Sequence, residues 1–362
     1  MAPENDLGMS QERVVTAAEP ETPRVVGLDV ARGLLIAYVV IVIHGSFWLR
    51  IVPAPENSLL LFEMPLIFMI SGAAYAYAPK PAQSVRSYLF YVLSRGVRIL
   101  VPFWAYTFVC SLIAIFARHM APLETIVAWL DPFRGGADHM YMMLSLHLWF
   151  VPPFLAVMAL MPLLTRLPVW RMAPLWVWAA GGALVVFAVD ALGATATALD
   201  RQTVFYTLWA LFGFGLGKSA ARFGVRDYAI VLTGTLMVLA SALLLFPTHT
   251  TADMQANKFP PNALFFLFSA AWVSVFMIAV RGLDARRIEA LARSRLLKPF
   301  IKSGYSIYLW QGLGYTIASL VGRQYGWNVL VVWIVAIALT VGLGSAAAPL
   351  ERLRVRARPR RV

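Results

Sequence analysis

The chain contains a single cysteine, Cys110, among its 362 residues. A lone thiol has no partner within the chain, so an intramolecular disulfide framework and a cysteine-based metal site are both excluded. Charged residues are also scarce, at 14% of the sequence, and there are only five histidines, at spacings that build no metal site. Hydrophobic residues make up 60%, and the mean hydropathy is +0.70. This composition indicates a polytopic membrane protein rather than a soluble domain.

The first 23 residues lack the apolar centre of a signal peptide, because they are polar and contain Pro, Glu, Thr and Ser. We expect residues 1–26 to form a disordered cytosolic tail and residues 350–362, which are rich in arginine, to form a basic cytosolic tail. Residues 27–349 are then one transmembrane domain. The net charge of +13 suits contact with anionic lipid headgroups and attraction of an anionic donor; nucleic-acid binding is not expected.

Apolar segments of membrane-spanning length recur along the whole of this domain. Ten are found, at residues 28–48, 58–78, 97–117, 146–165, 174–192, 203–218, 228–246, 262–280, 304–321 and 328–348. With the N-terminus in the cytosol, 25 of the 31 Lys and Arg residues fall on the inner side and six on the outer side, in agreement with the positive-inside rule. The sequence therefore predicts an all-α bundle of about ten transmembrane helices with both termini cytosolic.

The first apolar segment holds two ionisable residues, Arg32 and His44, although such groups are costly in hydrocarbon. Arg32 lies near the cytosolic end, and His44 lies about 18 Å further out along a helix. Histidine titrates near neutrality and can accept and return a proton, so we predict that His44 is a general base. A hydrogen-bonded packing histidine is the alternative.

Glu63 enters the second apolar segment from its outer end, at a depth similar to that of His44. We predict that Glu63 accepts the Nδ1 proton of His44, which would fix the tautomer and leave Nε2 as the base. The alternative is that Glu63 belongs to a separate polar network or faces the outer interface.

Four sequence motifs are spread over the apolar region. They are LDVARG at residues 28–33 followed by His44, FEMPLIFMISG at 62–72, SRGVRILVPFW at 94–104 and SGYSIYLWQ at 303–311; HLWFVPPFL at 147–155 adds weaker support. Together they resemble the membrane acyltransferase-3 family, over residues 27–348.

The resemblance implies an enzyme that transfers an acyl group, expected to be acetyl, from cytosolic acyl-CoA to a hydroxyl of a carbohydrate or glycoconjugate at the outer side of a bacterial inner membrane. It assigns the catalytic base to His44, an essential basic position to Arg32 and a further one to Arg98. We expect Arg32, Arg95 and Arg98 to hold the phosphates of the donor, since the arginine fork matches phosphate oxygens. For Arg95 and Arg98, ordinary positive-inside anchoring is the alternative.

Two departures from the family pattern bear on the site. Eleven residues separate Arg32 from His44, where ten are common, so a straight helix would turn the two side chains about 120° apart instead of about 20°. A π-bulge absorbs one residue, so we predict an irregularity between residues 34 and 43. Gln311 stands where many relatives have histidine, and glutamine cannot relay protons.

Other residues are weaker candidates. We expect Trp149 and Gln311 to contact substrate, and Tyr305 and Tyr308 to be interfacial aromatic residues. Lys258 is placed in an outer loop at residues 247–261. A proton-coupled transporter using His44 and Glu63 is the alternative function, although the two halves of the chain show no internal repeat.

Overall fold

The computed structural model describes residues 26–79, 83–118, 123–133, 142–167, 174–192, 197–219, 222–248 and 250–353. These residues form helices and contain no β-strand. The long helices are α1 (Val26–Tyr38), continued by η1 (Val39–Ile43) and α2 (His44–Trp48), then α3 (Glu63–Tyr77), α4 (Val85–Arg118), α7 (Val151–Leu164), α8 (Leu175–Ala191), α9 (Ala198–Ser219), α10 (Val225–Leu245), α12 (Ala263–Arg281), α14 (Lys298–Tyr325) and α15 (Val329–Ala347).

Short helices connect the long helices. They are η2 (Glu56–Leu60), α5 (Leu123–Leu130), α6 (Met142–Ser145), η4 (Leu146–Phe150), α11 (Met254–Lys258), α13 (Ala285–Arg293) and η8 (Ala348–Arg352). Of the predicted tails, only Val26 and residues 350–353 lie within the described part of the chain, where Val26 begins α1 and η8 ends at Arg352. The rest of the two tails lies outside the described residues.

Each of the ten predicted segments falls on a helix. Among the described residues, seven helices are long and apolar enough to cross a membrane, and α8 is apolar but shorter. The other two segments lie in α9 and α14, which carry more polar residues, Lys218 and Gln311 among them. The structure thus supports an all-helical membrane protein, while the number of ten spans and the cytosolic position of the termini stay predictions.

Glycines allow two helix pairs to approach closely, as is common in membrane bundles. A Cβ on Gly72 of α3 would lie 1.8 Å from the carbonyl oxygen of Ala210 in α9, and one on Gly213 of α9 would lie 1.8 Å from that of Met69 in α3. A Cβ on Gly344 of α15 would lie 2.4 Å from the backbone of α14. These positions leave no room for a larger side chain unless the helices separate.

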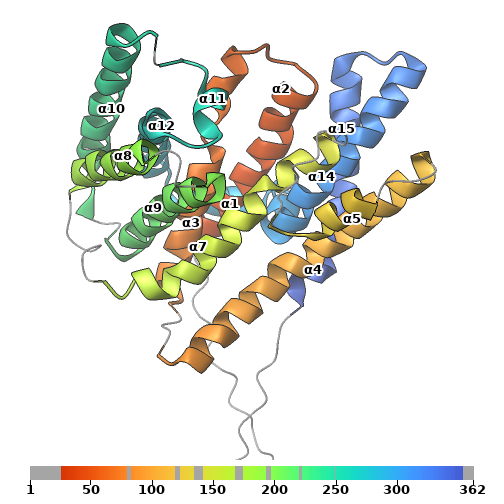
Figure 1. Cartoon of the computed structure of the whole chain (residues 1–362), viewed down its shortest axis with the longest axis horizontal. Helices are drawn as coiled ribbons and strands as arrows, with labels where there is room; N and C mark the ends of the chain where they lie inside the picture. The colour runs from red at the N-terminus through yellow and green to blue at the C-terminus, as the bar shows by residue number, and fades with distance from the viewer. Residues whose placement is uncertain are drawn as a thin grey trace, which may run out of the picture.

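The start of α1 and the end of η8 lie at the same end of the bundle. Gly33 packs against Ile301, near the start of α14, and the Glu351 carboxylate in η8 accepts a hydrogen bond from the Ser306 backbone N–H, just inside the same helix. An even number of helical passes would bring the two ends of the domain together in this way; the number itself stays a prediction. Figure 1 shows α2 and α11 at the upper end of the bundle.

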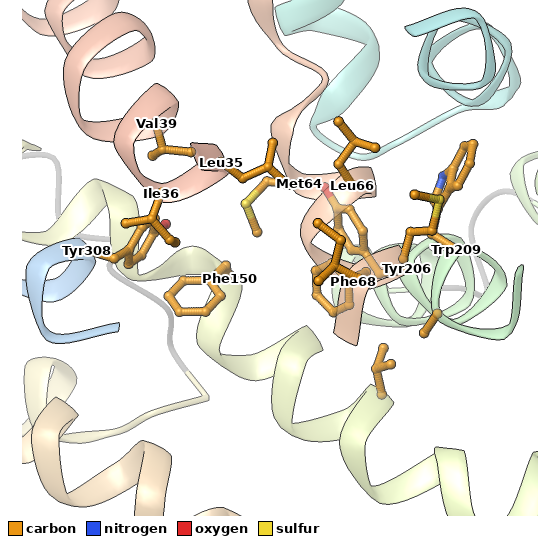
Figure 2. Packing of buried hydrophobic residues seen from close by; sticks show 14 of the residues in the cluster. Leu35, Ile36, Val39, Met64, Leu66, Phe68, Phe150, Tyr206, Trp209 and Tyr308 are labelled. Atoms are coloured by element: carbon orange, nitrogen blue, oxygen red, sulfur yellow. The ribbon is translucent and has the colours of Figure 1, made fainter. Parts of the chain in front are cut away.

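Buried aromatic and aliphatic side chains fill the centre of the bundle (Figure 2). Phe68 of α3 stacks on Tyr206 of α9, with ring centroids 4.4 Å apart. Phe150, at the end of η4, meets Tyr308 of α14 edge to face at 4.6 Å. This packing ties α3 to α9 and η4 to α14, and so fixes the helices that carry the polar residues described next.

Candidate active site

The first helix contains the predicted irregularity. Residues Val39–Ile43 form a π-helical turn, and the His44 N–H donates to the Val39 carbonyl oxygen, five residues back. The turn takes up the extra residue between Arg32 and His44, as the spacing requires. The prediction of an irregularity between residues 34 and 43 is confirmed.

Two side chains of α14 and α15 hold this turn. The Tyr315 hydroxyl donates to the Val40 carbonyl oxygen at 2.6 Å, and the Trp333 indole N–H donates to the Ile41 carbonyl oxygen at 2.9 Å. Gly45 permits the approach of Trp333, because a Cβ there would lie 2.5 Å from the indole nitrogen. These two donors add side-chain hydrogen bonds to carbonyl oxygens of the π-turn and tie it to α14 and α15.

The His44 ring is fixed by two contacts. Nδ1 lies 2.6 Å from Oε1 of Gln311, and the ring stacks on Trp48 with centroids 3.9 Å apart. With the amide oxygen facing it, Nδ1 carries the hydrogen and donates, so Nε2 is the acceptor. Among the described residues Nε2 has no hydrogen-bond partner. His44 is half-buried, and its role as a general base stays a prediction.

A second histidine, His147, lies beside the first. Its ring is buried, with its centroid 6.4 Å from that of His44, and its Nε2 donates to the Leu309 carbonyl oxygen at 2.9 Å. The Tyr308 hydroxyl donates to the His147 carbonyl oxygen at 2.7 Å. Tyr308 is therefore a buried residue of the site and not an interfacial aromatic; Tyr305 donates to the Ile99 carbonyl oxygen. Hydropathy cannot distinguish these positions, because both tyrosines lie on the same helix, three residues apart.

Glu63 does not pair with His44, so this prediction is wrong. Its Oε1 accepts a hydrogen bond from Nζ of Lys258 at 2.7 Å, and Gln311 occupies Nδ1 of His44. The depth estimate placed Glu63 at the correct end of α3 but could not identify its neighbour. A cation from elsewhere in the chain stabilises the buried carboxylate more strongly than a neutral imidazole would.

Lys258 was placed in an outer loop from the sequence, and the structure shows that its side chain is only 4% exposed. The segment around α11 is held inward: the Met254 N–H donates to Ser58 Oγ at 3.1 Å, and Asn262 Nδ2 donates to Asn257 Oδ1 at 2.7 Å. The Lys258 ammonium lies 5.3 Å from the centre of the Trp149 ring. A lysine flanked by aromatic and proline residues, as in NKFPP, was the available signal for a buried cation.

The predicted donor-binding arginines lie towards the other end of the bundle. Arg32 is exposed and pairs with Asp29 at 3.0 Å, and Arg95 lies over the Tyr91 ring at 5.8 Å. Arg98 is exposed and precedes Ile99, whose carbonyl α14 binds through Tyr305. This arrangement agrees with the depths expected from the sequence, and donor binding by the three arginines stays a prediction.

The described residues contain no group of three or more His, Cys, Asp and Glu side chains that could hold a metal ion. His119, His139 and His249 lie outside the described residues. Trp149 meets Phe259 edge to face at 4.8 Å, and Gln311 is fully buried against His44. Contact of Trp149 and Gln311 with substrate stays a prediction.

Apolar helices surround a histidine that Gln311 and Trp48 hold in place, and this arrangement defines a class: a helical membrane protein with a fixed histidine in its interior. A family model described as acyltransferase domain matches residues 25–348, nearly the whole chain. The chain therefore belongs to the acyltransferase-3 family, as its motifs predicted. No curated protein and no solved structure matches it.

Proposed function

We propose that the protein transfers an acyl group, acetyl in the simplest case, from cytosolic acyl-CoA to a hydroxyl of a carbohydrate or glycoconjugate at the outer side of a bacterial inner membrane. The family supports acyl transfer in general. The observation that carries the specific proposal is His44, whose Nδ1 is held by Gln311 and whose Nε2 has no partner among the described residues.

In the proposed reaction Nε2 of His44 removes the proton of the acceptor hydroxyl as its oxygen attacks the thioester carbonyl carbon. The new C–O bond forms, the C–S bond breaks, and the leaving coenzyme A thiolate takes up the proton from His44. The acyl group passes directly from donor to acceptor, and no covalent acyl-enzyme is required.

The other residues support this step. Gln311 and Trp48 keep the imidazole in one orientation, since Gln311 bonds Nδ1 and Trp48 stacks on the ring. Arg32, Arg95 and Arg98 would bind the donor phosphates near the opposite end of the bundle, where charge-assisted hydrogen bonds position the coenzyme. The acyl arm would then reach His44 along the bundle interior.

The test is transfer of radiolabel from acetyl-CoA to membrane and cell-envelope glycans by the protein in vesicles. We expect His44→Ala, at equal abundance, to lose about 100-fold or more of the rate, since general bases contribute on that scale. Gly181→Ala, which introduces a methyl group with nothing within 4 Å, is the matched control.

Undiminished transfer by His44→Ala would refute the assignment of the base. No transfer from acetyl, succinyl or longer donors, together with proton-coupled uptake of a polar solute, would replace the enzyme with the transporter alternative.

A further inference from the structure

The buried pair of Glu63 and Lys258 has unused hydrogen-bonding capacity. Both side chains are 4% exposed, and a single contact of 2.7 Å joins Nζ to Oε1. Oε2 of Glu63 is buried without a hydrogen-bond partner among the described residues. Replacing such a pair with apolar residues often costs no stability, so an ion pair inside a membrane domain indicates a function.

Aromatic residues and a further unpaired hydroxyl surround the pair. The Lys258 ammonium lies 5.3 Å from the Trp149 ring centre and 5.5 Å from that of Phe259. Tyr206 lies 5.9 Å from Trp149, ring to ring, and its buried hydroxyl has no partner in the described part of the chain. A carboxylate oxygen, ammonium hydrogens and a phenol hydroxyl beside aromatic faces match the hydroxyls and the apolar faces of a sugar ring.

This cluster lies close to the proposed base. The Tyr308 ring centroid is 6.5 Å from that of His44, and the His147 ring centroid is 6.4 Å from it, with His147 lying two residues before Trp149 in η4. The Lys258 ammonium lies over the Trp149 ring, so η4 carries residues next to both the pair and His44. A hydroxyl-bearing molecule bound by the pair would therefore have its other hydroxyls near Nε2 of His44.

We propose that Glu63, Lys258, Trp149 and Tyr206 form a glycoside-binding subsite that selects uncharged sugars. The pair is electrically neutral as a unit. A neutral glycoside can therefore hydrogen-bond to the unused donors and acceptor of the pair, and no net charge is buried. A uronate would be repelled by Glu63 and an amino sugar by Lys258, and each would lose hydration that the paired charges cannot replace. That this subsite holds the acyl acceptor rests on the proposed function.

The test is binding of three probes, methyl glucoside, methyl glucuronide and methyl glucosaminide, measured by saturation-transfer NMR on the protein in zwitterionic nanodiscs without donor. The native protein is expected to prefer the glucoside. Glu63→Gln leaves the ammonium unpaired and should shift the affinity ratio towards the glucuronide by about tenfold, and Lys258→Met should shift it equally towards the glucosaminide.

Two further proteins separate recognition from folding. The exchanged pair, Glu63→Lys with Lys258→Glu, restores neutrality and should restore the preference for glucoside even if the single variants fail to fold. Asp190→Asn breaks the pair of Asp190 and Arg201, joined at 2.8 Å and partly exposed. It changes the charge by the same amount and should leave the order of preference unchanged.

The same charge preference in both single variants and the native protein, or no binding of any probe, would overturn the subsite. The subsite would also be overturned if the exchanged pair preferred the glucuronide or the glucosaminide to the glucoside. Because binding is measured without acyl-CoA, the two proposals fail separately: acyl transfer without the predicted shifts refutes the subsite, and the shifts without acyl transfer refute the function.

Discussion

Gln311→Leu tests the orientation of the base directly. Gln311 is fully buried, and its Oε1 lies 2.6 Å from Nδ1 of His44. Leucine is similar in size and removes the acceptor, which leaves a buried N–H unsatisfied and lets the ring exchange tautomers. An unsatisfied buried donor costs about 1–3 kcal/mol. When this cost is added to the activation free energy of acyl transfer, kcat falls by about 5- to 150-fold.

The measurement is the initial rate of acetyl transfer to envelope glycans at varied acetyl-CoA. We expect kcat to fall while KM for acetyl-CoA stays constant, because the arginines expected to bind the donor lie towards the other end of the bundle. Gln311→Glu keeps an acceptor facing Nδ1 and should retain activity within a few fold.

Two results would refute this reasoning. A native kcat in Gln311→Leu would show that the hydrogen bond does not orient the base. Equal loss in Gln311→Glu and Gln311→Leu would show that Gln311 is not needed as an acceptor.

Three further predictions concern the bundle and the donor. Tyr315→Phe leaves the Val40 carbonyl without its donor at 2.6 Å, so kcat should fall about 5-fold or more with the donor KM unchanged; a native kcat would contradict a role for the π-turn. Gly72→Ala forces α3 from α9 and should lower stability by about 1–3 kcal/mol in detergent melting, whereas Gly181→Ala should be neutral; equal melting temperatures would contradict the close packing. Arg32→Gln should raise KM for acetyl-CoA about tenfold with little change in kcat, and an unchanged KM would remove Arg32 from the donor site.

Local features of the chain were accessible to sequence analysis. Composition identified a membrane protein, because long apolar segments with few charges have no other stable environment. The spacing between Arg32 and His44, one residue longer than is common in the family that the motifs resemble, predicted the π-turn, because one extra residue shifts the helical phase by about 100°. The motifs identified the family.

The charged contacts of the site were not accessible in this way. The rise per residue gives the depth of a side chain along its helix, but not the direction in which it points or the helix it meets. Glu63 was placed at a plausible depth and assigned the wrong partner for this reason. Lys258 was assigned to an outer loop because hydropathy treats a segment between helices as a loop. Long-range hydrogen bonds from Met254 to Ser58 and from Lys258 to Glu63 hold that segment against the bundle.

The sequence by itself determined the class of protein and the helical segments, because both depend on composition within one segment, and its motifs, with the family spacing that they imply, indicated the irregular turn before His44. Only the tertiary structure decided that Gln311, 267 residues away, holds the His44 ring and that Lys258 neutralises Glu63. Those choices depend on which helix faces lie against each other, and that is settled by close packing between segments far apart in the chain.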